Sequence, residues 1–133
     1  MTRYVIDPPT LLQLVTRGQL VSAEHQLVAP NSIRSQALAL LFAAVRGGDL
    51  AEVEALGLHD RMTELKLRLL GDRVSRRTAW TIAREQGWES IDDAEYLAVT
   101  RLQADALVTV NSDLAAKAAG VVPVVPVEAL FTA

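Results

Sequence analysis

Short apolar runs alternate along the chain with longer segments in which apolar residues recur at helical spacing. The runs at 3–7, 25–29 and 106–110 predict strands, and the run at 121–130 predicts an edge strand or an extended tail because it contains two prolines. These runs show little polar alternation, which indicates a parallel sheet buried on both faces. The pattern therefore predicts an α/β fold, a three-layer α/β/α sandwich with a short parallel sheet of roughly four or five strands.

The helices are predicted from apolar periodicity together with capping residues and glycines. Thr10 is expected to cap the first helix, Asp49 the third, and Gly57 is expected to interrupt the third. Val74 lies between polar residues and is interpreted as a minimal strand, while Gln36 falls at the edge of a buried helical face. The predicted helices span residues 11–18, 32–47, 50–71, 76–86, 90–104 and 113–120.

The length, net charge and cysteine content of the chain limit the classes of function that it can have. The 133 residues predict one domain, 1–133, and the formal charge of −3 gives no overall attraction to nucleic acid or to an anionic membrane. There are no cysteines, so disulfides and thiolate metal sites are excluded. No apolar stretch approaches the roughly 18 residues of a membrane span, and the first residues lack a signal peptide. We expect a cytoplasmic protein with no membrane association.

Polar residues follow two of the predicted strands. Asp7 ends the first strand, and Thr109, Asn111 and Asp113 follow the strand at 106–110. The carboxyl ends of parallel strands share one edge of the sheet, where ligands gather in such folds. Oxygen ligands converging there suit Mg²⁺ or Mn²⁺, which can activate water against a phosphodiester.

Each of these residues also has a purely structural interpretation. Asp7 before two prolines suits a turn or a helix cap, and Asp93 forms a plausible capping box with Ser90. Asn111 suits a turn and Asp113 an N-cap. The residues alone therefore leave the structural and the functional interpretations open.

Three stretches resemble PIN-domain ribonucleases, in particular the single-domain VapC-type toxins of bacterial toxin–antitoxin pairs. They are "YVID" at 4–7, "APNSIRSQALALL" at 29–41 and "DAEYLAVTRLQADALVT" at 93–109. The resemblance implies a PIN-like fold, a Mg²⁺-dependent (or Mn²⁺-dependent) endoribonuclease activity on RNA, an antitoxin protein as partner, and a homodimer. It implies that Asp7 and Asp93 hold the metal.

Two acids of that family pattern are replaced by amides. Gln36 stands where the family has a glutamate, and Asn111 stands where it has an aspartate. Each lost carboxylate at about 4 Å from a divalent cation would contribute several kcal/mol to binding at an effective dielectric of about 20. Asp113, two residues late, is the candidate substitute, and Asp92 or Glu64 are weaker ones. We therefore expect reduced activity, with Asn111 or Asp113 orienting metal-bound water and Thr109 supporting the loop.

RNA contact requires a local basic patch, because the net charge is negative. Arg73, Arg76 and Arg77, with Arg84 further along the same helix, form the densest positive group; the alternative is an ordinary solvated helix face. The apolar residues of 50–70 suit either a core helix or the dimer and antitoxin surface that the resemblance implies.

Two further functions stay open. One is a catalytically silent PIN domain that binds a partner protein or RNA. The other is a receiver-type signalling domain, which is disfavoured because the only late lysine, Lys117, lies in a predicted helix.

Overall fold

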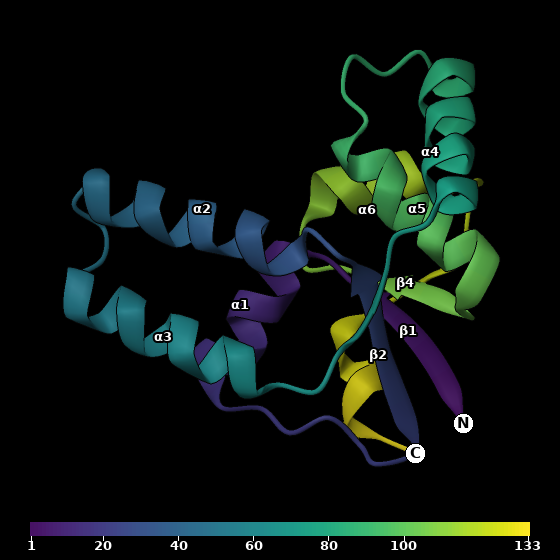
Figure 1. Cartoon of the computed structure of the whole chain (residues 1–133). Coiled ribbons are helices and arrows are strands. Elements are labelled where there is room, and N and C mark those ends of the chain that lie inside the picture. The colour runs from purple at the N-terminus through teal and green to yellow at the C-terminus, as the bar shows by residue number, and fades with distance from the viewer.

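The computed structural model describes all residues, 1–133 (Figure 1). Its five strands form one parallel sheet in the order β3-β2-β1-β4-β5. The strands are β1 (Thr2–Ile6), β2 (His25–Pro30), β3 (Arg68–Leu70), β4 (Ala106–Val108) and β5 (Val124–Val125). The helices are α1 (Pro8–Arg17), α2 (Ile33–Arg46), α3 (Glu52–Glu64), α4 (Arg73–Gln86), α5 (Asp92–Gln103) and α6 (Ser112–Ala118), followed by a 3₁₀ turn at Val127–Phe131.

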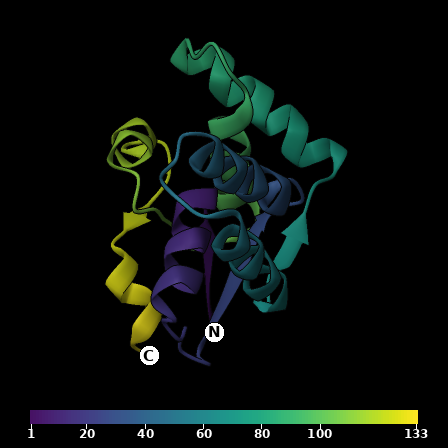
Figure 2. The same cartoon turned by 90° about the vertical axis from the view of Figure 1, so that its left-hand side faces the viewer.

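The helices form two layers on opposite faces of the sheet. Helices α1, α2 and α3 pack together, whereas α5 lies against β1, β2 and β4, and α4 packs on α5 (Figures 1 and 2). Right-handed crossovers produce this division, because the chain moves from β1 to β3 in one direction and then returns across the sheet to β4 and β5. The predicted three-layer α/β/α sandwich with a short parallel sheet is confirmed.

The central strands supply the core. Twenty-eight buried residues form one hydrophobic cluster, in which Val5, Ile6, Val28, Leu107 and Val108 are fully buried. Burial on both faces explains why these strands show no polar alternation in the sequence. No helix of the structure is both long enough and apolar enough to span a lipid bilayer.

The central strand β1 and its neighbour β4 define a switch point. They are neighbours in the sheet, but the chain leaves β1 toward α1 on one face and leaves β4 toward α6 on the other. In open α/β sheets the crevice at such a point, outside the carboxyl ends of the strands, is where ligands bind. Asp7 follows β1 and Thr109 follows β4, so both lie at this position.

The region 50–71 differs from the prediction. Helix α3 continues through Gly57, and it ends at Glu64 instead of continuing to residue 71. An interior glycine costs roughly 1 kcal/mol of helix propensity, and the burial of Leu58 and Met62 outweighs that cost. Residues Arg68–Leu70 form β3 because they pair with β2, a long-range contact that local periodicity does not report.

Two predicted boundaries are also wrong. Val74 is not a strand, because α4 begins at Arg73 and leaves Val74 exposed on the helix. A capping box between Asp72 and Ser75 fixes this earlier start. Asp49 does not cap α3, since Ala51 occupies the N-cap position without a side-chain hydrogen bond.

Candidate functional site

Asp7 is the N-cap of α1, and its side chain is buried, with 2% of its surface exposed. Its carboxylate accepts a hydrogen bond from the backbone N–H of Thr10. The sequence had predicted that Thr10 itself would cap the helix. Pro8 and Pro9 occupy the first turn, where a missing N–H costs no hydrogen bond. The helix-cap interpretation of Asp7 is therefore confirmed, and Thr10 is a partner of the cap instead of the cap itself.

A hydroxyl network joins Asp7 to the loop after β4. The Thr109 hydroxyl donates a 2.7 Å hydrogen bond to Asp7 Oδ2, and the Thr10 hydroxyl donates to Asp7 Oδ1. These two hydroxyls in turn accept from the backbone N–H groups of Asn111 and Val110, each at 3.0 Å. Asp7 thereby positions the 109–111 loop, and Thr109 supports that loop through these hydrogen bonds.

Burial raises the pKa of Asp7 above its ordinary value, and the hydrogen bonds from Thr10 and Thr109 oppose that effect. Burial also raises the pKa of Tyr96, strengthened by the negative charges of Asp7 and of the acids that open α5. The switch point is therefore a poorly solvated region in which added negative charge is costly. This electrostatic environment would favour a cation.

Asn111 uses its side chain to begin α6. Its Oδ1 accepts hydrogen bonds from the backbone N–H groups of Asp113, at 3.0 Å, and Leu114, at 3.4 Å. Asn111 is thus the N-cap that the sequence assigned to Asp113. Asp113 instead lies in the first turn of α6 with its side chain exposed, where its charge complements the helix dipole.

Gln36 lies on the half-buried edge of α2, as predicted, and contacts α5. The Tyr96 hydroxyl donates a hydrogen bond of 2.5 Å to Gln36 Oε1. The acceptor of this hydrogen bond is therefore a neutral amide. The pair joins the two helical layers beside the switch point.

Asp93 lies in the first turn of α5 and is half-buried. The predicted capping box with Ser90 is absent: Ile91 occupies the N-cap position, and the Ser90 hydroxyl accepts from Asp92 instead. The carboxylate of Asp93 accepts a hydrogen bond of 2.8 Å from the Lys117 ammonium on α6. The same ammonium lies 4.3 Å from the centre of the Trp88 ring.

These positions do not fit a divalent cation as they stand. No three His, Asp or Glu side chains lie close enough together to hold a metal ion. Asp7 accepts from two hydroxyls, Asp93 is paired with an ammonium, and the oxygens of Asn111 and Gln36 accept from other donors. The structure thus keeps the predicted residues near one edge of the sheet without assembling Asp7, Asp93 and Asp113 into one ligand set.

Of the two weaker candidates, Asp92 is exposed at the start of α5, which is the correct edge of the sheet. Glu64 is at the wrong edge. It ends α3 just before β3 begins, so it lies toward the amino ends of the parallel strands.

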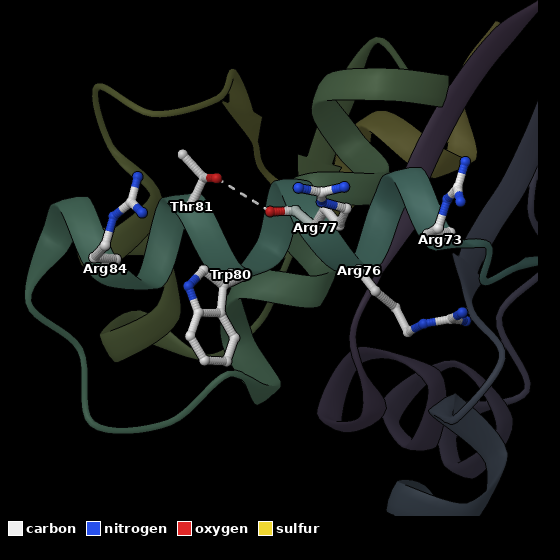
Figure 3. A pocket seen from close by; sticks show the side chains of 6 residues that line it. All are labelled: Arg73, Arg76, Arg77, Trp80, Thr81 and Arg84. Carbon is white, nitrogen blue, oxygen red and sulfur yellow. Dashed lines mark hydrogen bonds between the residues drawn. The ribbon is translucent and has the colours of Figure 1, made fainter.

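A second candidate surface lies on α4. Its residues recur at helical spacing along one face and line a shallow, open hollow (Figure 3). Four are arginines, and no acidic residue lines the hollow. The lining residues are Arg73, Arg76, Arg77, Trp80, Thr81 and Arg84, which we call the α4 arginine face.

Trp80 is the unexpected member of this face. Its side chain is 66% exposed, and it lies between Arg84 and Arg77 along the helix (Figure 3). The opposite side of α4 is buried on α5 through Ile82 and Ala83. Packing therefore does not explain why a large aromatic ring stands among arginines.

Arg76 connects this face to the carboxyl edge of the sheet. Its guanidinium donates to the backbone oxygen of Gly71, and its side chain also lines a smaller hollow beside Ser32 and Glu95. Helix α4 starts just after β3, so its first turn lies at the same edge as Asp7.

Sequence reasoning missed three of the residues that shape these regions. Trp80 could have been assigned to this face from the sequence, because it is four residues from Arg76 and four from Arg84 and so shares their side of the helix. Tyr96 also had a local signal, being three residues after Asp93 on one helical face. Lys117 had none, since its contact with Asp93 spans 24 residues.

Comparisons with known proteins establish the fold class of the chain and no more. The chain matches no protein-family model and no curated protein. Among solved structures it is similar to the crystal structure of PAE2754 from Pyrobaculum aerophilum, with a TM-score of 0.73 and 24% sequence identity. The match covers 98% of this chain and 93% of that chain. Two chains with this little sequence identity share their architecture, so the likeness carries no activity to this protein.

Proposed function

We propose that this chain is a VapC-like PIN-domain protein that binds single-stranded RNA on the α4 arginine face, and that its Mg²⁺-dependent cleavage site is silent. The observation that carries the proposal is the set of side chains at the switch point. Asp7 is retained there, but every other position of the expected acidic set is an amide or an acid already paired with a cation.

The VapC-like assignment is supported by where the matching residues lie. Asp7 and Thr109 lie side by side after β1 and β4 and are hydrogen-bonded, and Asp93 opens the helix that precedes β4. This arrangement is the one expected if "YVID" and "DAEYLAVTRLQADALVT" are the corresponding PIN segments. Cytoplasmic location follows from the proposal, because the RNA target is there.

Silence of the site is supported by charge. Mg²⁺ binds oxygen ligands in near-octahedral geometry and relies on carboxylates to offset the cost of losing water. Here one carboxylate is hydrogen-bonded by two threonine hydroxyls, and the other is neutralised by Lys117. A divalent cation would have to displace these partners and would find only amide oxygens at the remaining two positions.

RNA binding is supported by the chemistry of the α4 arginine face. Arginine guanidinium groups neutralise phosphates and release counterions, while an exposed aromatic ring stacks on an unpaired base. Duplex RNA offers phosphates but no free base face, so the Trp80 ring favours single strands. The proposed RNA therefore lies along α4, with Arg76 at the end nearest the switch point.

The test is binding of a fluorescently labelled, unstructured RNA, followed by anisotropy at several salt concentrations in EDTA. Changing Arg73, Arg77 and Arg84 together to glutamine is expected to weaken binding at least tenfold and to flatten the salt dependence. A matched control changes three exposed arginines elsewhere, Arg17, Arg46 and Arg68, and alters the net charge equally. If both triple variants lose affinity to the same extent, the α4 arginine face is not the RNA site.

A second candidate, weak Mg²⁺-dependent or Mn²⁺-dependent RNA cleavage, is favoured by one observation. Asp7 remains a buried acid at the switch point, and Asp92, Asp93 and Glu95 at the start of α5 contribute charges that reach the same region. The metal would be held by Asp7 and Asp93, with Asp113 as the third candidate. Cleavage that requires both Asp7 and Asp93 would select this candidate over the silent one.

A protein partner is supported by the surface of α2 and α3. Leu38 and Phe42 are exposed on α2, and Val53 and Leu56 are exposed on α3, which is more apolar surface than a solvated helix pair needs. We propose that a second copy of this chain, in a homodimer, covers this surface, with an antitoxin as the alternative occupant. Light scattering measures the molar mass of the purified chain and of Phe42→Glu with no other protein present. A dimeric parent and a monomeric variant would support the homodimer, whereas a monomeric parent would exclude it.

A further inference from the structure

Lys117 is held by two groups from two different parts of the chain. Its ammonium donates a 2.8 Å hydrogen bond to Asp93 on α5 and lies 4.3 Å from the ring centre of Trp88, in the turn between α4 and α5. A carboxylate and an aromatic ring face are the two protein groups that best attract a cation. Asp93 and Trp88 therefore form a cation site whose occupant is the ammonium of Lys117.

The contact between Lys117 and Asp93 is the only lysine–carboxylate ion pair in the structure. The chain has two lysines, Lys66 and Lys117, while its other basic side chains are arginines or histidines. Only Lys117 pairs with an acid, and the one other close contact between opposite charges is between the adjacent residues His59 and Asp60. Lys117 is half-buried, with 36% of its side chain exposed, whereas a lysine on a solvated helix face extends into water.

We propose that Lys117 is the built-in counter-ion of the carboxyl edge and excludes divalent cations by occupying Asp93. The inference rests on the proposal that this edge is a degenerate metal site, and it is independent of RNA binding by α4. The ammonium occupies Asp93 Oδ2 and offsets the charge of the carboxylate, so a divalent cation would have to displace it to use that oxygen and would bind the remaining one against electrostatic repulsion. Lys117 also joins α6 to α5 through this contact.

The probe is Mn²⁺ alone, which quenches tryptophan fluorescence when it binds nearby. The chain has two tryptophans, so Trp80→Phe leaves Trp88, the ring beneath Lys117, as the only one. In this background Lys117→Met is expected to show saturable quenching of Trp88 by Mn²⁺ at concentrations at least tenfold below those required by the parent. Lys117→Arg keeps the charge and is expected to behave as the parent does.

Two controls locate the effect. Lys66→Met removes the other lysine and is expected to leave quenching unchanged, while Asp93→Asn combined with Lys117→Met is expected to abolish the gain. Circular dichroism of each variant confirms folding, and Lys117→Gln replaces Lys117→Met if the latter is unfolded. Equal Mn²⁺ quenching in the parent and in the folded Lys117 variant would overturn the proposal. RNA binding in EDTA is measured separately, so its failure leaves this result untouched.

Discussion

The Thr109 hydroxyl donates a 2.7 Å hydrogen bond to the Asp7 carboxylate, and this bond links the ends of the two central strands. It crosses the switch point of the sheet, where α1 and α6 leave toward opposite faces. The same hydroxyl accepts from the N–H of Asn111 and so supports the loop that carries this amide. Thr109 is thus a structural tie whose loss affects both the buried acid and the loop.

Thr109→Val is expected to destabilise the fold by about 1–3 kcal/mol, because it removes one donor from a buried carboxylate and one acceptor from a backbone N–H. Chemical denaturation measures the change. Thr100→Val is the control: its hydroxyl is buried and donates only to the backbone oxygen of Tyr96 one helical turn earlier. A loss no larger than that of the control would show that the Asp7 contact does not stabilise the fold.

Asp7 makes the stability of the protein depend on pH in a definite direction. Burial raises its folded pKa above 3.8, so between pH 3.8 and that raised value the folded chain binds the proton more tightly than the unfolded chain. The free energy of unfolding contributed by Asp7 therefore falls as pH rises through this window. Asp7→Asn cannot titrate, so the stability of the parent relative to the variant should decrease from about pH 4 to pH 7.

Urea unfolding of both proteins at several pH values in this range gives the difference directly. Effects of titrating groups that do not interact with Asp7 cancel in that difference. A gap that widens in favour of the parent as pH rises would contradict the assignment of a raised pKa to Asp7.

Restoring the two acids should create a metal site. Gln36→Glu with Asn111→Asp adds two carboxylates beside Asp7, and each would attract a divalent cation by several kcal/mol at an effective dielectric of about 20. Without metal the double variant should melt at a lower temperature than the parent, since the added charges repel Asp7. Mn²⁺ should raise its melting temperature, and adding Lys117→Met should increase that rise.

The control for these reversions places the same charges elsewhere. Gln86→Glu with Gln103→Glu adds two acids at exposed positions on α4 and α5, away from the switch point. It should show no Mn²⁺ effect. If the reversion pair responds to Mn²⁺ no more than this control does, the two amides are not the reason for weak metal binding.

Trp80 should contribute base stacking to RNA binding. Trp80→Ala is expected to weaken binding of single-stranded RNA by about 1–3 kcal/mol while leaving the affinity for duplex RNA nearly unchanged. Leu20→Ala removes a large, exposed apolar side chain that lies outside both α4 and the proposed dimer surface, and it should affect neither affinity. Anisotropy titrations with both RNAs measure the two affinities, and equal losses on single-stranded and duplex RNA would exclude stacking.

The sequence predicted the fold class because buried parallel strands and amphipathic helices leave strong local patterns. The strand before Asp7, the start of the strand predicted at 106–110 and the edge position of Gln36 all follow from local chemistry, although that strand ends at Val108. The strand β3 was missed because its three residues are specified by pairing with β2 and carry no clear alternation.

The sequence predicted where the candidate site lies, but it did not predict the hydrogen bonds and the ion pair that its residues make. Burial of strand ends brought Asp7, Thr109 and Asn111 to one edge, as the sequence indicated. The exchange of roles between Asp113 and Asn111 at the α6 N-cap depends on backbone geometry that composition does not report. The pairing of Asp93 with Lys117 depends on how α6 packs against α5, which no local pattern predicts.

The central proposal is that this chain binds RNA without cutting it, and a single cleavage measurement tests it most directly. A 5′-labelled single-stranded RNA, bound to the α4 arginine face at saturating protein, is incubated with Mg²⁺ or Mn²⁺ and resolved on a denaturing gel. The parent is predicted to cleave it no faster than the Asp7→Asn, Asp93→Asn double variant. Metal-dependent cleavage by the parent that the double variant lacks would contradict the claim.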